Sequence, residues 1–336
     1  MADAAGDDEA LMREAMAAAR DARGRTSPNP WVGCVIVPDG DEPAAIGATE
    51  PPGGLHAEAV ALAMAGDSAK GATVYVTLEP CSHHGRTPPC ADALIDAGVR
   101  RVVIGVEDPD PLVRGRGVAR LREAAVEVEV GVCRQAIAEQ LAPYLKHRAT
   151  GRPWVVLKLA ASLDGRIAAP DGSSRWITGP LARADAHQLR AESDAVLVGA
   201  GTVRADDPAL TVRHLPGYEG DGPLRVVLGH APADARVQPA LELAGDLPDV
   251  LGQLGARGIV QLLVEGGATV AHQFHHAGLV DRYVLYLAPA LFGGDDARPA
   301  FAGPAAGTVQ DVWRGRIVSV EQLGPDLRVE LAAAGE

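Results

Sequence analysis

The sequence predicts two consecutive α/β domains, each built around a layered sheet covered by helices. Two observations support this: short apolar strands alternate with helical segments along the chain, and the alternation restarts after a clear helix stop. A length of 336 residues suits about two domains, and an apolar content of 47% is ample for two cores. Aromatic residues make up only 4%, so we expect cores of Ala, Val and Leu.

The first half begins with a helix over 10–23. Strands and helices then follow in turn: strand 31–37, helix 56–66, strand 73–79, helix 90–99, strand 100–106, helix 117–125, strand 126–132 and helix 133–151. The last helix ends at Gly151, and Arg152 and Pro153 follow, which is a typical stop signal. We therefore predict domains at 1–151 and 152–336.

The second half repeats the alternation. We expect strand 154–165, helix 180–194, strands 195–201 and 224–229, helix 247–258, strand 260–267, helix 269–279, strand 282–289 and a terminal hairpin over 316–331. The Pro- and Gly-rich stretch 215–223 is predicted to be a surface loop.

Charge and composition exclude several classes of function. A formal net charge of −13 argues against non-specific nucleic-acid binding, which needs a basic surface. No apolar run is long enough to span a bilayer, and the acidic start MADAAGDDEA lacks the basic and apolar regions of a signal peptide. Four cysteines form no disulfide framework. We expect a cytoplasmic protein without a membrane or nucleic-acid partner.

His56, Cys81 and Cys90 form a split set of zinc-ligand residues. Three protein ligands leave the fourth tetrahedral position for water, which is the catalytic arrangement. Glu58 cannot share a helical face with His56, so the two converge only if His56 stands at the helix entrance. The alternative is two buried thiols and an ordinary surface His. The placement of each residue at the edge of a strand or helix favours the zinc site.

The order His-x-Glu, then Pro-Cys and a second Cys, is a signature of zinc nucleobase deaminases, in which the Glu moves protons and is not a ligand. Eight residues separate Cys81 from Cys90, so the match is a variant. We predict hydrolytic deamination of an amino-bearing ring carbon, with Glu58 as the proton shuttle. His83, His84 and Arg86 lie between the cysteines and contact either substrate or solvent.

The second half contains two weaker signals. The segment 260–274 is a strand, a Gly-Gly turn and a helix entrance, where backbone amides can hold a phosphate, although Gly-Gly also ends strands for steric reasons. In 197–213, Thr202 follows two glycines, and Asp206 and Arg213 lie beyond. That segment is either a second binding turn or an Asp-rich turn on a solvated loop.

Lys158 and Asp164 flank a predicted strand end. An unpaired Lys within an apolar strand is costly to bury, so we expect Lys158 to line a cleft. Ser174, Trp176 and Arg190 form a further polar and aromatic group. Arg190 either binds a phosphate or forms a salt bridge on the helix surface.

Longer motifs make a family resemblance specific. The strings SPNPWVGCVIV, HAEAVAL, TLEPCSHHGRTPPCADALIDAGV and DPDPLVRGRGV resemble the deaminase half of the bifunctional deaminase/reductase family of riboflavin biosynthesis. The strings KLAASLDGRIA, GSSRWITG, ADAHQLRAESDAVLVGAGTVRADDPALTVR and LVEGGATVA resemble its reductase half. The resemblance extends from about Glu9 to Leu331.

The resemblance implies a cytidine-deaminase-like three-layer α/β/α domain followed by a dihydrofolate-reductase-like α/β domain. The first would use zinc to deaminate 2,5-diamino-6-(5-phosphoribosylamino)pyrimidin-4(3H)-one, and the second would use NADPH to reduce the ribosyl group of the product to ribityl. The family also implies a homo-oligomer.

The resemblance also implies roles for individual residues. The implied NADPH contacts are Ala160, Trp176, Thr202, Asp206, Gly267, Ala268, Thr269, Val270 and Ala271. The implied substrate contacts in the reductase are Ser174, Arg190, Leu210, Arg213 and Glu265. Lys158, Asp164 and Glu265 are the candidates for the proton donor of the reduction.

Two alternatives remain. The segment after 224–229 is shorter than in the family, and Gly229-His230 replace its usual Asp-Ser, so the second domain is alternatively a catalytically silent binding or assembly module. A nucleic-acid deaminase would share the zinc motif, but the acidic charge and the appended domain argue against it.

Overall fold

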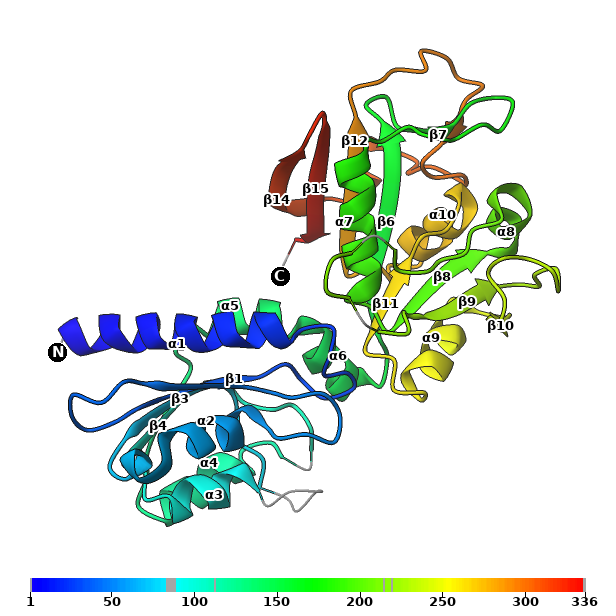
Figure 1. Ribbon diagram of the computed structural model, residues 1–336. Coiled ribbons are helices and arrows are strands. Elements are labelled where there is room, and N and C mark those ends of the chain that lie inside the picture. Colours follow the sequence, from blue (N-terminus) through cyan, green and yellow to red (C-terminus); the bar gives the residue numbers. More distant parts are fainter. Residues whose placement is uncertain (1, 83–88, 112, 214, 219, 335–336) are drawn as a thin grey trace. The chain divides into compact units, whose positions relative to one another are not determined.

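The computed structural model describes residues 2–82, 89–111, 113–213, 215–218 and 220–334 (Figure 1). The chain divides into two compact units, Met1–Gly151 and Arg152–Glu336. Among the described residues, no helix has the combination of length and apolarity that crossing a membrane would need.

The first unit contains a five-stranded sheet in the order β2-β1-β3-β4-β5. The strands are β1 (Gly33–Val37), β2 (Ala45–Ala48), β3 (Thr73–Leu78), β4 (Arg101–Val106) and β5 (Glu127–Val130). β1 runs antiparallel to both β2 and β3, whereas β3, β4 and β5 are parallel to one another. The carboxyl ends of β3 and β4 therefore meet at one edge, where an α/β sheet usually binds its ligand.

Helices cover both faces of this sheet, which makes three layers. The helices are α1 (Ala2–Ala22), α2 (Ala57–Ala65), α3 (Cys90–Asp96), α4 (Arg116–Glu123), α5 (Arg134–Gln140) and α6 (Ala142–Thr150), with a short 3-10 helix, η1 (Gly66–Ala69). α1 and α5 lie on one face, and α2, α3 and α4 lie on the other (Figure 1).

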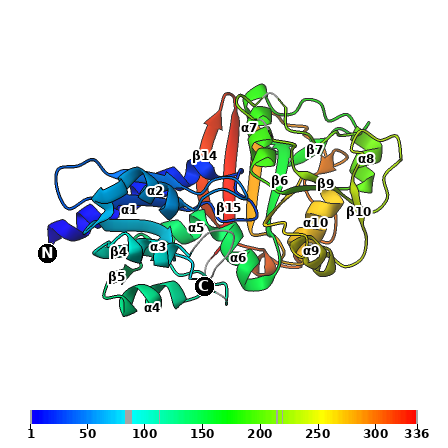
Figure 2. The ribbon, with the colours of Figure 1, turned by 60° about the horizontal axis from the view of Figure 1, so that its bottom comes forward.

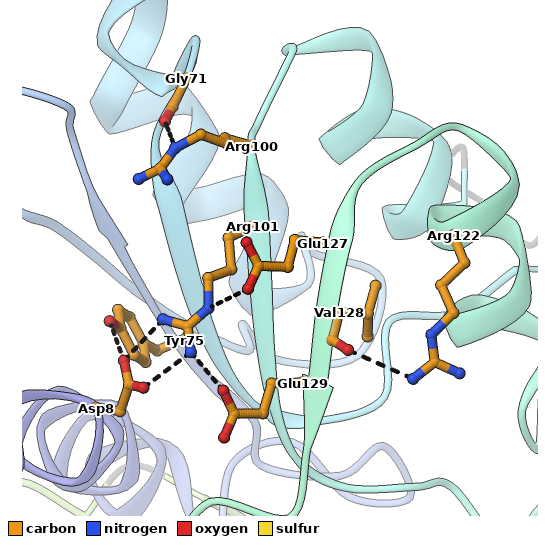
Figure 3. Close-up of polar contacts among 9 residues, drawn as sticks. All are labelled: Asp8, Gly71, Tyr75, Arg100, Arg101, Arg122, Glu127, Val128 and Glu129. Carbon is orange, nitrogen blue, oxygen red and sulfur yellow. Dashed lines mark hydrogen bonds and ion pairs between the residues drawn. The ribbon is translucent and has the colours of Figure 1, made fainter. Parts of the chain in front are cut away.

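A polar cluster fastens α1 to the sheet (Figure 3). Asp8 on α1 accepts hydrogen bonds from both Nη atoms of Arg101, each at 2.9 Å, and from the Tyr75 hydroxyl at 2.7 Å. Arg101 also forms ion pairs with Glu127 and Glu129 of β5. One guanidinium on β4 therefore links α1 to the parallel edge of the sheet.

The second unit contains an eight-stranded sheet in the order β10-β9-β8-β11-β6-β12-β15-β14. Its strands are β6 (Trp154–Ser162), β8 (Ala195–Gly199), β9 (Leu224–Leu228), β10 (Leu241–Leu243), β11 (Gln261–Val264), β12 (Arg282–Ala288), β14 (Gly315–Leu323) and β15 (Asp326–Ala333). The strands from β10 to β12 are parallel, and the β14–β15 hairpin continues the sheet antiparallel. β7 (Arg166–Ala168) and β13 (Arg298–Pro299) form a separate pair.

Two apolar clusters lie on opposite faces of this second sheet. The helices are α7 (Pro180–Ala191), α8 (Ala200–Asp206), α9 (Leu247–Gly255) and α10 (Ala268–His276), with a short 3-10 helix, η2 (Val309–Asp311). α9 and α10 pack on alternate residues such as Val155 and Leu157, whereas α7 and α8 pack on Val156 and Val196. Figure 2 shows the strands between these two helical layers.

Most of the predicted elements are confirmed, but several differ. The first helix begins at Ala2, eight residues before its predicted start, and the short strands β2, β7 and β13 were not predicted. The helix predicted over 133–151 is two helices, which part at Leu141 because Pro143 in the first turn of α6 lacks an N–H. The strand predicted over 195–201 ends at Gly199, and α8 begins at Ala200. The short segment after β9 still supplies an edge strand, β10, which we did not predict.

Candidate active sites

His56 stands at the entrance of α2, as its spacing from Glu58 required. Its backbone is extended, with φ −74° and ψ 159°, and the helix begins at the next residue. Glu58 follows in the first turn and is 4% exposed. Burial, followed by the charge of Cys81, raises the pKa of Glu58 to about 7. A carboxyl with this pKa can both accept and return a proton near neutral pH.

Cys81 and Cys90 meet His56 from two different elements. Cys81 follows the end of β3, and Cys90 opens α3. The His56 Nδ1 atom lies 3.7 Å from the Cys81 Sγ and 3.3 Å from the Cys90 Sγ. The Cys90 backbone N–H donates to the Cys81 Sγ at 3.3 Å. Hydrogen bonds, first from the Cys90 side chain and then from His56, lower the pKa of Cys81, which favours its thiolate.

These three side chains fit a zinc ion. Their ligand atoms lie within 4.8 Å of one another, and within the described part of the chain they are the one group of three or more His, Cys, Asp or Glu residues so arranged. One imidazole nitrogen and two sulfurs are the donors that zinc prefers, and one tetrahedral position stays open.

A cavity of about 540 Å³ opens beside this cluster, and we call it the zinc-side pocket. It is lined by His56, Glu58 and Cys81, and also by Asn29, Glu79, Asp108, Asp110, Tyr144 and Arg148. The Tyr144 hydroxyl donates to Asp108 Oδ2 at 2.9 Å, and Arg148 lies 3.7 Å from Asp110. The sequence reasoning assigned no role to this second set, although its SPNP and DPDP motifs contain three of the residues. His83, His84 and Arg86 lie outside the described residues.

A second cavity of about 660 Å³, the cationic pocket, lies in the second unit. Its charged lining residues are Lys158, Arg175, Arg183, Arg190, Arg213 and Arg236. Ala160, Trp176 and Leu210 also line it, so the structure brings these predicted cofactor and substrate contacts together. No Asp or Glu is among the described lining residues, and such a pocket suits a phosphorylated ligand.

Lys158 is buried at this pocket with Glu265 as its counter-charge. The Lys158 Nζ lies 3.8 Å from Glu265 Oε2 and 5.7 Å from the centre of the Tyr286 ring. Burial lowers the pKa of Lys158 and outweighs the opposing effect of Glu265. The Tyr286 hydroxyl donates to Asp185 at 2.5 Å, and Asp185 forms an ion pair with Arg328 at 2.8 Å. Tyr286 was not predicted, because an aromatic residue in a strand gives no signal beyond core packing.

A third cavity of about 1220 Å³, the glycine-lined pocket, follows the carboxyl ends of β8, β9, β10 and β11. It is lined by Thr202, Asp206, Gly267, Ala268, Thr269 and Val270 of the predicted cofactor contacts, and by Ser174. Arg175, at the cationic pocket, donates to the Asp206 carbonyl at 2.6 Å and so joins the rims of the two pockets.

The glycine-lined pocket has the features of a dinucleotide site. α10 begins there, so its free backbone amides and positive dipole end favour a phosphate. Thr202 Oγ1 accepts the Gly267 N–H at 3.0 Å, which fixes the turn before the helix. A Cβ on Gly266 would lie 2.6 Å from the Val270 Cβ, so the backbone approaches α10 too closely for a side chain. The residues present therefore fit NADPH.

Three predicted residues line neither pocket of the second unit: Asp164, Ala271 and Glu265, and the last of these contacts the lining residues Lys158 and Arg190. The Asp164 carboxylate accepts hydrogen bonds from the Gly293 N–H and the Ser162 hydroxyl. Those bonds, Gly293 first, lower the pKa of Asp164 to about 2, so it is a poor proton donor. Ala271 is fully buried in the apolar core, one helical turn after Gly267.

Comparison with known families assigns both halves of the chain. Residues 5–106 match the cytidine and deoxycytidylate deaminase zinc-binding region, and residues 153–329 match the RibD C-terminal domain. The chain is 43% identical to the riboflavin biosynthesis protein RibD of Escherichia coli, with 97% of this chain and 100% of that protein covered. It is 41% identical to RibD of Bacillus amyloliquefaciens, with 96% and 95% covered.

Solved structures agree with the sequence comparison. The Acinetobacter baumannii RibD structure superimposes with a TM-score of 0.93 at 40% identity, covering 98% of this chain and 100% of that one. A deaminase/reductase from Thermotoga maritima gives a TM-score of 0.89 at 34% identity, with 98% and 99% covered. The predicted fold class, a cytidine-deaminase-like domain followed by a reductase domain, is confirmed. The chain belongs to the RibD family of zinc- and NADPH-dependent bifunctional deaminase/reductases of riboflavin biosynthesis.

Proposed function

We propose that residues 1–151 catalyse the deamination and residues 152–336 the reduction, in that order on one phosphorylated pyrimidine. The substrate would be 2,5-diamino-6-(5-phosphoribosylamino)pyrimidin-4(3H)-one, and the intermediate 5-amino-6-(5-phosphoribosylamino)uracil. The observation that carries this proposal is that each unit contains its own complete set of chemical groups. The first holds the His56, Cys81 and Cys90 cluster, and the second holds the joined cationic and glycine-lined pockets.

In the deaminase, His56, Cys81 and Cys90 hold zinc, which when bound supplies the Lewis acidity that lowers the pKa of water to about 7. Glu58 accepts a proton from the attacking water and returns it to the departing amino group. The burial of Glu58 beside the cluster supports this role, because a buried site has little bulk water that could carry the proton instead. Tyr144 and Asp108 form part of the substrate wall.

In the reductase, the glycine-lined pocket binds NADPH, which when bound supplies a hydride. Thr202, Asp206 and the turn at 267–270 would hold it in that pocket, and Ala160 and Trp176 would contact it from the cationic pocket. Arg190, Leu210 and Arg213 bind the phosphorylated sugar there, and Glu265 orients Arg190. Ser174 would act on the cofactor side of the substrate, and its position in the lining of the glycine-lined pocket supports this role.

Lys158 is the proton donor that we propose for the reduction. It borders the cationic pocket, and burial lowers its pKa, which makes its proton easier to give. Asp164 is removed from that pocket, and its low pKa leaves it without a proton near neutral pH. Glu265 has a lowered pKa against the opposing effect of burial, because Arg190 and Lys158 stabilise its charge.

A coupled assay tests both activities at once. Zinc-loaded protein is given the diamino substrate with NADPH, and ammonia and NADPH are followed separately. We expect ammonia first and then one NADPH oxidised per ammonia. Ammonia release without NADPH oxidation, also after direct addition of the deaminated intermediate, would establish a silent second domain. Oxidation of NADPH with that intermediate but no ammonia release would refute the deaminase.

We further propose that the protein works in the cytoplasm as a homo-oligomer, on the support of its family resemblance. Sedimentation equilibrium at micromolar concentration measures the assembly. A mass of 34.7 kDa, that of one chain, would contradict self-association.

A further inference from the structure

Glu79 is a buried carboxylate that stands two residues before Cys81. It follows the end of β3, and its backbone N–H continues the ladder by donating to the Val106 carbonyl at 2.9 Å. The side chain borders the zinc-side pocket, yet the residue is only 4% exposed. A carboxyl group this deeply buried needs hydrogen bonds to offset its desolvation.

Four backbone N–H groups from one segment supply those bonds. Glu79 Oε1 accepts from Gly117 at 2.9 Å and from Val118 at 3.3 Å. Glu79 Oε2 accepts from Gly115 at 3.0 Å and from Asp108 at 3.3 Å. The backbone amides of Asp108 and of the start of α4 therefore surround a single carboxylate.

The same segment also touches the residue between Glu79 and Cys81. A Cβ on Gly117 would lie 2.0 Å from the Pro80 carbonyl oxygen, so the two backbones are in direct contact. Pro80 has a fixed φ and little freedom of its own. Holding Glu79 and Pro80 therefore fixes the direction in which Cys81 leaves the strand.

The other end of the segment faces the pocket. Asp108, Asp110 and Val113 line it, and the Asp110 N–H donates to Asp108 Oδ1 at 2.8 Å. The Glu79 carboxylate thus bonds both to Asp108, in the wall of the pocket, and to Gly117, which contacts Pro80 next to Cys81.

We infer that Glu79 is the positioning residue of the deaminase site: it sets both the Cys81 ligand and the wall formed by Asp108, Asp110 and Val113, without touching metal or substrate. This inference rests on the proposed zinc ligands. Neighbours that orient a metal ligand typically change metal affinity tenfold to a hundredfold when they are removed.

The test uses Glu79→Gln, because the amide keeps the shape but places an NH₂ group against backbone donors. We expect zinc affinity, measured by competition with a chromogenic chelator, to fall about tenfold to a hundredfold. The thiolate-to-cobalt charge-transfer band of the Co²⁺-substituted protein should shift, and the KM for deamination should rise. Tyr144→Phe, which touches only the wall, should change KM and leave zinc affinity unaltered.

Two further variants separate positioning from general destabilisation. Asp8→Asn removes another buried carboxylate of the same unit, on α1 and outside the pocket, so it should lower stability but preserve the cobalt spectrum. Gly117→Ala keeps Glu79 but adds a methyl group that clashes with the Pro80 carbonyl, so it should weaken zinc binding. This variant tests the inference even if Glu79→Gln fails to fold. Wild-type zinc affinity and cobalt spectrum in folded Glu79→Gln, or in Gly117→Ala if the first is unfolded, would overturn the inference. Zinc retention by Cys81→Ser would instead overturn the proposed ligand set.

Discussion

Arg190 and Glu265 form a two-pronged ion pair at the wall of the cationic pocket. Arg190 Nε donates to Glu265 Oε1 at 2.5 Å, and Nη2 donates to Oε2 at 2.9 Å. The remaining Nη1 donates to the Thr211 carbonyl at 3.1 Å, in the segment that carries Arg213. The pair therefore fixes a guanidinium from α7 against two segments that are distant from it in sequence.

Arg190→Lys should impair the reductase while leaving the deaminase intact. A lysine keeps the charge but has a point-like ammonium, which cannot donate to both Glu265 oxygens and to Thr211. Loss of one charged hydrogen bond costs about 1.5–3 kcal/mol, so kcat/KM for NADPH oxidation should fall about tenfold to a hundredfold. Ammonia release by the same preparation is the internal control. An unchanged kcat/KM would show that the two-pronged geometry is irrelevant to the reaction.

Glu58→Gln should keep zinc and lose deamination. The amide occupies the same volume in the first turn of α2 but cannot accept a proton, so ammonia release should fall about 10²- to 10⁴-fold. Zinc content by elemental analysis and NADPH oxidation with the deaminated intermediate should both stay at wild-type levels. Substantial residual ammonia release would mean that another group moves the proton.

Cys81→Ser should lose zinc, because a serine hydroxyl is a much weaker ligand than a thiolate. The matched control is Cys133→Ser, which changes a half-buried cysteine at the start of α5, outside the cluster. We expect less than stoichiometric zinc in the first variant and one zinc per chain in the second. Equal zinc contents would remove Cys81 from the ligand set.

Asp8→Asn should destabilise the first unit in a pH-dependent way. The hydrogen bond from Arg101 lowers the pKa of Asp8 below its ordinary value of 3.8. Its stabilisation is therefore complete above the unfolded pKa and is lost as pH falls through the lowered folded value. Urea unfolding at pH 7 should show a loss of about 1.5–3 kcal/mol for the variant.

The acid limb provides the control for that experiment. Asn does not titrate, so the difference between wild type and Asp8→Asn should shrink below pH 3.8. A difference that stays constant across the acid range would show that Asp8 stabilises the unit by shape alone.

Gly266→Ala should weaken NADPH binding. The added Cβ would lie 2.6 Å from the Val270 Cβ, so the start of α10 must move. Such overpacking costs about 1–3 kcal/mol, and the KM for NADPH should rise. Gly252→Ala is the control, because its Cβ meets nothing within 4 Å and lies inside α9. That variant should have an unaltered KM and a slightly higher melting temperature.

The zinc cluster was predictable because each of its residues has a local sequence signal, although Cys81 and Cys90 lie 25 and 34 residues after His56. The spacing of His56 and Glu58 demanded a helix entrance between them, and Cys90 was placed at a helix start by its own sequence context. The contacts among Lys158, Arg190 and Glu265 were harder to predict, since these residues come from β6, α7 and the end of β11. The hydrophobic periodicity of one element carries no information about its contacts with another. Sequence reasoning therefore offered Asp164 equally, and only the tertiary structure separates it from the pocket.

Smaller errors have local causes. β10 spans three residues, which is too short for an alternating pattern to emerge. The apolar run at 195–201 concealed the start of α8, because Ala and Gly suit a strand end and a helix start alike. Ala271 follows Gly267 by one helical turn, a spacing that places both residues on the same side of a helix, so helical periodicity alone could not show that Ala271 is buried in the apolar core while Gly267 lines the pocket.

The presence of both units in one chain, which divides at Gly151, determines how many copies of each unit the cell makes. Each of the three cavities draws its described lining from one side of that boundary. The peptide bond between Gly151 and Arg152 thus completes neither catalytic centre. Its effect is on dosage: every translated chain delivers one deaminating and one reducing centre, so the cell makes producer and consumer of the intermediate in equal numbers.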